Sequence, residues 1–350
     1  MNYTTAPELT SLAARTGQPD PALFWDTLTA FQRTAALSAA IDLDLFSGIA
    51  EGNRTPSQLA AFCKGTERGV RILCDYLTII GLLLKDEGGY QLTPTSAAFL
   101  NRHSPTYSGT MARFLNLPDS VSAFGKLADV VRRGETALEG KGTVDPEDPV
   151  WVVFATSMTA MMGPMAEFIG SLINGAGLRK MRVLDIAAGH GLFGIAVARQ
   201  NPLAEIVALD WPAVLEIARE NARKAGVGAR YETLPGDAFA IDFRGPYDAI
   251  LLTNFLHHFD PPTCVSLLRK IHASLKPGGR VITLEFVPNE DRISPPIPAA
   301  FSLIMLAQTP DGDAYTFNQL SEMFTDAGFG QSKLIPVPNS PETAIVTQKS

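Results

Sequence analysis

The stretch RVLDIAAGHGLFG, residues 182–194, decides the fold of this chain. It begins as a short aliphatic run that closes on Asp185 and continues through three glycines, Gly189, Gly191 and Gly194, into a helical pattern. Glycines after a strand let the backbone approach a ligand closely, because no Cβ intervenes. The stretch therefore predicts a parallel α/β sheet with a ligand at the carboxyl end of this strand.

Alternating strands and helices continue from this stretch to the end of the chain. Helical patterns begin after Gly191, Pro212, Pro261 and Thr316. The β-rich runs are RVLDIA (182–187), AEIVALD (204–210), ARYETLP (229–235), YDAILLTN (247–254), RVITLEF (280–286) and two more in the tail, 332–350. This alternation predicts an α/β fold: a doubly wound, Rossmann-like sheet of seven strands, mostly parallel, with its ligand crevice at the carboxyl ends.

The N-terminal part reads as a mainly α winged-helix domain. Apolar spacing over 21–50 predicts two successive helices, Thr55-Pro56 starts another, and a longer helix is expected over 67–84. Residues 83–100 alternate around Gly88-Gly89, which predicts a hairpin followed by a helix start at Thr93.

A connector rich in Gly, Pro and charge, residues 132–149, separates this region from a helical pattern over 150–175. We therefore expect a winged-helix domain over 1–110, connecting helices that line a substrate pocket over 111–175, and a ligand-binding domain over 176–350.

Composition narrows the class of partner. The formal charge is −7, and residues 51–100 hold equal numbers of basic and acidic side chains, which disfavours nucleic acid and a winged-helix regulator. The cysteines Cys63, Cys74 and Cys264 have no metal-ligand spacing, and their odd number disfavours a disulfide framework. No long apolar segment or secretory leader is apparent, so we expect a cytoplasmic protein without a membrane partner.

Acidic residues follow three successive strands: Asp185, Asp210 in ALDWP and Asp237 in GDAF. With VLDIAAGHG, LLTNFLHHFD and LKPGGRVITLE, they resemble class I S-adenosylmethionine-dependent methyltransferases, specifically the small-molecule O-methyltransferases that include plant caffeate and bacterial polyketide enzymes. The N-terminal half resembles the winged-helix dimerisation domain of that family through RTAALSAAIDLDLF, RGVRILCDYLTIIGLL and YQLTPTSAAFL. The resemblance implies a homodimer that transfers a methyl group to a hydroxylated small molecule.

The resemblance also implies which residues contact S-adenosylmethionine. The cofactor-binding candidates are Asp185, Gly189 and Gly191 at the methionine end, Asp210 at the ribose, Asp237, Ala238, Phe239 and Phe259 toward the adenine, and in addition Trp211 and Thr253. For Asp185 the alternative is a helix cap. Asp185 ahead of the loop, together with LKPGG, disfavours a nicotinamide oxidoreductase, the other reading of the glycine pattern.

The same resemblance implies the catalytic candidates: His257 as general base and Glu285 as the carboxylate that orients it. A metal site at His257 and His258 is disfavoured because consecutive residues on an extended chain point in opposite directions. Where relatives place a second glutamate, this chain has Ala314, which leaves carbon or nitrogen methylation as the alternative reaction. By the same resemblance the substrate-pocket candidates are Phe154, Met158, Met161, Met162, Phe301, Met305 and Gln308. Their apolar, sulfur-rich character suits a flat aromatic or polyketide-like molecule, and the alternative is that they fill the core.

Overall fold

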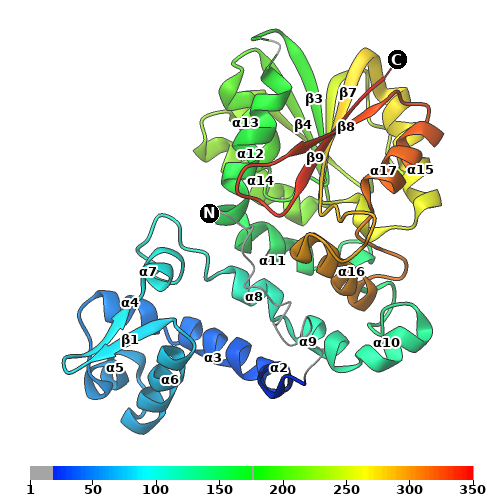
Figure 1. The fold of residues 1–350 in the computed structure, drawn as a ribbon. Helices are drawn as coiled ribbons and strands as arrows, with labels where there is room; N and C mark the ends of the chain where they lie inside the picture. Colours follow the sequence, from blue (N-terminus) through cyan, green and yellow to red (C-terminus); the bar gives the residue numbers. More distant parts are fainter. Residues whose placement is uncertain (1–18, 176, 350) are drawn as a thin grey trace. The chain divides into compact units, whose positions relative to one another are not determined.

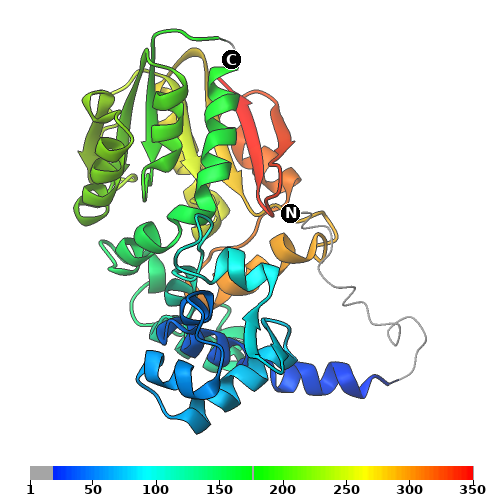
Figure 2. The ribbon, with the colours of Figure 1, turned by 90° about the vertical axis from the view of Figure 1, so that its left-hand side faces the viewer.

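A computed structural model describes residues 19–175 and 177–349, and the chain divides into two compact units at Asn116–Leu117 (Figures 1 and 2). The N-terminal unit contains α2 (Pro21–Leu28), α3 (Ala30–Asp42), α4 (Leu45–Ala50), α5 (Pro56–Cys63), α6 (Glu67–Ile79), β1 (Leu83–Asp86), β2 (Gly89–Leu92), α7 (Pro94–Phe99) and α8 (Met111–Leu115). The antiparallel hairpin β1–β2 follows α6 as expected for a winged helix. Phe46, Leu59 and Leu77 lie in the buried core of this N-terminal unit.

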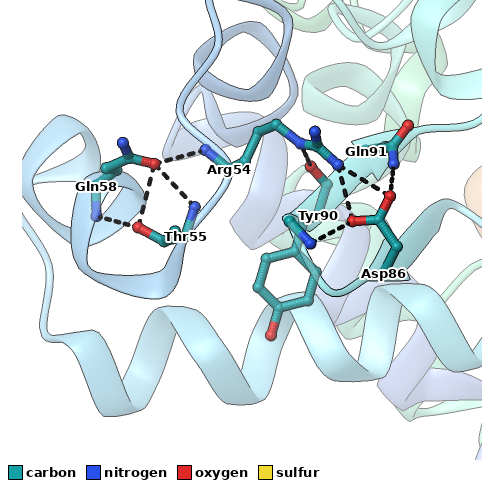
Figure 3. A network of polar contacts seen from close by, with 7 residues as sticks. Arg54, Thr55, Gln58, Asp86, Tyr90 and Gln91 are labelled. Carbon is teal, nitrogen blue, oxygen red and sulfur yellow. Dashed lines mark hydrogen bonds and ion pairs between the residues drawn. The ribbon is translucent and has the colours of Figure 1, made fainter.

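Polar contacts fasten the hairpin to the start of α5. Thr55 and Gln58 form a reciprocal capping box that satisfies backbone N–H groups at the helix start. The neighbouring Arg54 side chain donates to the Tyr90 carbonyl at 3.3 Å and to Asp86 at 2.9 Å (Figure 3). These contacts orient the wing relative to α5.

The helix boundaries differ from the sequence predictions in two places. Residues 21–50 form three helices, α2, α3 and α4, because the chain turns at Thr29 and adopts a left-handed conformation at Asp44. The helix expected over 67–84 ends at Ile79. Gly81 has a positive φ, and the Leu82 N–H bonds back to the Leu77 carbonyl, which closes the helix before β1 begins.

The C-terminal unit is built around a sheet of seven strands. They are β3 (Met181–Ile186), β4 (Ala204–Asp210), β5 (Tyr231–Pro235), β6 (Tyr247–Thr253), β7 (Leu275–Glu285), β8 (Ser332–Pro336) and β9 (Thr343–Gln348). The strand order is β5-β4-β3-β6-β7-β9-β8; β9 is antiparallel to both β7 and β8, and the other paired strands are parallel. The predicted doubly wound α/β fold is thus confirmed, and β9 enters between β7 and the edge strand β8.

Helices cover both faces of this sheet (Figure 1). On one face lie α12 (Thr159–Asn174), α13 (Leu192–Gln200) and α14 (Pro212–Lys224); on the other lie α15 (Pro261–Ser274) and α17 (Phe317–Asp326). The central strands β3, β4 and β6 are nearly continuous in buried, mostly aliphatic residues, as parallel strands covered on both sides must be, whereas the edge strands β5 and β8 are more exposed. The rigid core therefore holds the strand ends in place.

The remaining elements of this unit are α9 (Pro118–Gly125), α10 (Leu127–Arg133), the 3₁₀ turns η1 (Gly142–Val144), η2 (Gly228–Arg230) and η3 (Leu256–His258), α11 (Val150–Ser157) and α16 (Pro296–Gln308). Among the described residues, no single helix has the length and apolar composition to cross a membrane. The helices α11 and α12 together are long and apolar enough, but the chain bends by 73° between them.

Candidate active site

The carboxyl ends of β3, β4 and β6 meet where the strand order reverses. Strand β3 lies between β4 and β6 and is parallel to both. Chain connections leave such a point in opposite directions, which opens a crevice for a ligand. Asp185, Asp210 and Thr253 lie at or beside these three strand ends, so the fold collects cofactor candidates that are distant in the sequence.

The loop after β3 needs its glycines for space and for backbone conformation. Gly189 and Gly191 have φ angles of +56° and +76°. A Cβ at Gly191 would lie 2.5 Å from the Tyr231 hydroxyl, whereas one at Gly189 meets no atom closer than 3.9 Å. Ala187 has a φ of +53°, a conformation in which an alanine is strained. The loop thus approaches Tyr231 closely at Gly191 and leaves room beside Gly189.

Asp210 fastens this loop to the end of β4. One carboxylate oxygen accepts the Gly189 N–H at 2.8 Å, and the other accepts the Trp211 N–H at 2.7 Å. Burial raises the pKa of Asp210 to about 6, although both hydrogen bonds oppose the rise. Asp210 is therefore a partly buried acceptor beside the glycine loop, and Trp211 precedes the first turn of α14.

Asp185 is fully buried beneath the loop. Its Oδ2 accepts the Gly194 N–H at 3.0 Å in the first turn of α13, and its Oδ1 has no hydrogen-bond partner among the described residues. Burial, together with the charge of Asp210, raises the pKa of Asp185 to about 8. This geometry matches the helix-capping alternative for Asp185.

An aromatic cluster adjoins the loop after β5. The Asp237 carboxylate accepts the Phe239 N–H at 2.8 Å, and the Phe239 ring meets the Phe259 ring edge-on with 4.9 Å between centroids. Lys270, on α15, donates to the carbonyls of Ala238 and Phe239 at 2.9 and 3.2 Å. The sequence did not indicate this role of Lys270, whose hydrogen bonds hold the backbone of the loop after β5.

His257 and Glu285 form a buried, hydrogen-bonded pair. The Glu285 Oε1 accepts the N–H groups of Phe255 and Leu256 at 3.1 and 2.9 Å, and its Oε2 is hydrogen-bonded to His257 Nδ1. Both side chains are at most 5% exposed. A carboxylate on Nδ1 selects the tautomer in which Nε2 carries a free electron pair. The pair therefore presents a basic nitrogen.

His258 occupies a different environment from its neighbour. The two histidines lie on η3, not on an extended chain, and their ring centroids are 4.3 Å apart, so the expectation that they point in opposite directions is wrong. Burial and the neighbouring His257 hold the pKa of His258 well below its usual value. Trp151 packs edge-on against its ring. No group of three or more metal-binding side chains occurs in the described part of the chain.

The substrate-pocket candidates separate into distinct environments. The Phe301 ring packs edge-on against His257, with 4.9 Å between centroids, and the Phe154 ring stacks on His190 at 6.4 Å. Gln308 donates to the Ser120 hydroxyl at 3.1 Å. Met158, Met162 and Met305 are buried, and Met161 is half-buried. The ring contact of Phe301 places it directly at the catalytic candidate.

Two buried residues at this site were not found from the sequence. Tyr231 carries a hydroxyl without a hydrogen-bond partner among the described residues, near Asp185 and Asp210, and Glu342 is a buried carboxyl near Glu285. Tyr231 lies in an ordinary strand pattern, and Glu342 lies in a turn-like PET sequence. Nothing local in either pattern indicates burial beside other acids.

Comparison with known proteins agrees with this architecture. The sequence profile of the O-methyltransferase domain matches residues 148–330, and that of the O-methyltransferase dimerisation domain matches residues 25–102. A Nostoc punctiforme structure assigned as an O-methyltransferase is 50% identical with a TM-score of 0.92, covering 95% of this chain and 100% of that one.

Two characterised relatives are similar over nearly their whole length. One is the S-adenosyl-L-methionine-dependent methyl transferase PigF of Serratia, 28% identical over 91% of this chain and 93% of its own. A structure of PigF with S-adenosylhomocysteine has a TM-score of 0.82 at 26% identity, over 95% of this chain and 100% of that one. The other is the 3-hydroxy-5-methyl-1-naphthoate 3-O-methyltransferase of Streptomyces sahachiroi, 28% identical over 90% of this chain and 91% of its own.

Proposed function

The chain belongs to the O-methyltransferase family, and from that premise we propose that it methylates a phenolic or enolic hydroxyl of an aromatic or polyketide-like molecule, with His257 as general base. Membership makes it an S-adenosylmethionine-dependent O-methyltransferase of small molecules. The relatives' aromatic naphthoate and polyketide substrates support the proposed acceptor class.

The residues around the glycine loop fit S-adenosylmethionine. Gly189 leaves open space on the ligand side, and Asp210 offers a carboxylate at the carboxyl end of β4. Asp237, Ala238, Phe239, Thr253 and Phe259 extend the same rim through strand ends and an aromatic cluster. The two acids Asp185 and Asp210, buried close together, suit a ligand that carries positive charge. In this proposal Asp210 binds the ribose, and Asp185 shapes the loop through α13.

When bound, S-adenosylmethionine supplies an electrophilic methyl group on a sulfonium. His257 accepts the proton of the acceptor hydroxyl at Nε2, because Nδ1 is hydrogen-bonded to Glu285. The Glu285 carboxylate then stabilises the imidazolium, while two backbone N–H groups hold it in place. Phe301 packs against the imidazole and restricts its orientation. General base catalysis of this kind contributes about 10²- to 10⁴-fold.

The observation that carries this proposal is the buried pair of His257 and Glu285. A carboxylate held by two backbone N–H groups and aimed at one imidazole nitrogen is an arrangement that prepares the other nitrogen to take a proton. The neighbouring His258 differs, because its Nδ1 is hydrogen-bonded to the Phe255 carbonyl and not to a carboxylate, and burial keeps its pKa low. Of the two neighbouring histidines, we therefore assign His257 as the general base.

The experiment compares His257→Ala with His103→Ala, which removes an exposed histidine of the N-terminal unit. We expect His257→Ala to lower the methyl-transfer rate constant at least about a hundredfold and to leave the affinity for S-adenosylhomocysteine nearly unchanged. Phenols, enolic diketones and an aniline serve as acceptors, and the methylated atom is identified by mass spectrometry and NMR. Wild-type turnover in His257→Ala would remove the base assignment.

We further propose that the enzyme is a homodimer formed through residues 25–102, the matched dimerisation domain. Large apolar side chains on α2 and α3 are exposed within the N-terminal unit, among them Phe24, Trp25 and Phe31, which are 59%, 59% and 69% exposed. Such a concentration of exposed apolar surface favours a protein partner. A second copy supplies one.

A further inference from the structure

A second buried carboxyl group adjoins the catalytic pair and has no role in the reaction described above. Glu342 is 2% exposed and directly precedes β9. The next residue, Thr343, pairs with Glu285 in the antiparallel register of β7 and β9. The sheet therefore brings Glu342 next to Glu285 from a distant part of the chain.

The two carboxyl groups differ in their hydrogen bonds. Glu285 accepts hydrogen bonds from the N–H groups of Phe255 and Leu256 and is hydrogen-bonded to His257, so both of its oxygens have partners. The Glu342 Oε2 has no hydrogen-bond partner among the described residues. A buried carboxyl with few donors retains its proton more readily than one that receives several. The hydrogen bonds thus distinguish Glu342 as the carboxyl group of the two that has an oxygen without a donor.

The surroundings of Glu342 act in the same direction. Burial and the negative charge of Glu285 on β7 raise the pKa of Glu342 to about 8, while the uncharged Asn254 side chain after β6 opposes the rise. The backbone of Asn254 is held by its N–H, which donates to the Leu284 carbonyl at 2.8 Å, and the residue has a left-handed conformation with a φ of +53°.

We propose that Glu342 is a positioning residue for the general base: it remains a neutral acid beside Glu285, so that the pair has one negative charge and this charge lies next to His257. This inference rests on the proposed function of His257. No bond to Glu342 forms or breaks during methyl transfer. Loss of its proton at alkaline pH places a second negative charge near the imidazole.

The first test observes the proton on Glu342 without any turnover. Protein labelled with ¹³C at glutamate carboxyl carbons is titrated by NMR, and the Glu342 resonance is the one missing in Glu342→Gln. We expect a midpoint above pH 6, compared with about 4.3 for an ordinary glutamate. A midpoint below pH 6 would overturn the proposal. In Glu285→Gln the same resonance should titrate at least one pH unit lower, and an unchanged midpoint would overturn the coupling.

The second test connects that proton to the base. The ring resonance of His257, identified by its loss in His257→Ala, should shift at the Glu342 midpoint in the wild type and not in Glu342→Gln. The methyl-transfer rate should have a matching inflection in its pH profile, which Glu342→Gln removes and the exposed control Glu322→Gln retains. An inflection that persists in Glu342→Gln contradicts the proposal. Full turnover in His257→Ala instead refutes the proposed function and leaves the NMR result to judge Glu342.

Discussion

Binding of S-adenosylhomocysteine should weaken as the pH falls through about 6, and Asp210 is the group responsible. Its carboxylate accepts the N–H groups of Gly189 and Trp211, yet burial raises its pKa to about 6. Ribose hydroxyls donate hydrogen bonds, so the ligand binds the ionised form of the carboxyl. Affinity from this contact is therefore complete well above the pKa and is lost as the pH falls through it.

The size of the effect follows from that pKa. About one pH unit below it, roughly ten of every eleven Asp210 side chains are protonated, which weakens binding about elevenfold, or about 1.4 kcal/mol. Asp210→Asn is permanently uncharged. It should weaken binding at about pH 8 by about 1.5 to 3 kcal/mol, the range for a hydrogen bond to a charged group.

The assay is calorimetric titration with S-adenosylhomocysteine at several pH values between about 5 and 8 and at constant ionic strength. Asp185 also titrates in this range, so the quantity that isolates Asp210 is the difference between the wild type and Asp210→Asn. Asp242→Asn, an exposed aspartate near the end of β5, is the matched control. An affinity that does not vary with pH in the wild type would refute the reasoning, as would an unchanged pH dependence in Asp210→Asn.

Three further predictions concern stability, the glycine loop and assembly. Because the pKa of Glu342 is raised, the folded protein retains a proton that the unfolded chain releases above about pH 4.5, so the free energy of unfolding falls as the pH rises toward 8. In urea unfolding the wild type should lose about 3 kcal/mol relative to Glu342→Gln between about pH 5 and 8, and parallel pH dependences of the two proteins would contradict this. Gly191→Ala should lower the affinity for S-adenosylhomocysteine at least about tenfold, because its Cβ would lie 2.5 Å from the Tyr231 hydroxyl at a φ of +76°. In the same titration the control Gly163→Ala should bind normally, because a Cβ at that position meets no atom within 4 Å. Phe31→Glu should convert the dimer to monomer in sedimentation velocity, since it puts a charge on the exposed apolar surface of α3. The control Ile293→Glu, in the other unit, should remain dimeric, and a dimeric Phe31→Glu protein would exclude this surface as the dimer interface.

Local sequence patterns were sufficient for most elements of the fold. Helix starts at Thr55, Thr93 and Thr316 are predictable because each threonine caps backbone N–H groups within three residues of itself. Helix ends were less accessible. The early stop of α6 at Ile79 depends on a backbone bond from Leu82 to Leu77, in a stretch that is apolar throughout and resembles a continuing helix.

The sequence by itself determined the fold and the glycine loop, because these depend on residue type and spacing within short segments, and its resemblance to the family implied the candidate base. Only the tertiary structure decided which groups lie together. The registers of β6, β7 and β9 bring Glu285 to His257, to which it is hydrogen-bonded, and bring Glu342 near enough to Glu285 for the charges to interact. The desolvation that raises the pKa of Asp185, Asp210 and Glu342 likewise comes from helices and strands packed around them. Burial and charge proximity are properties of the assembled sheet, and no local pattern encodes them.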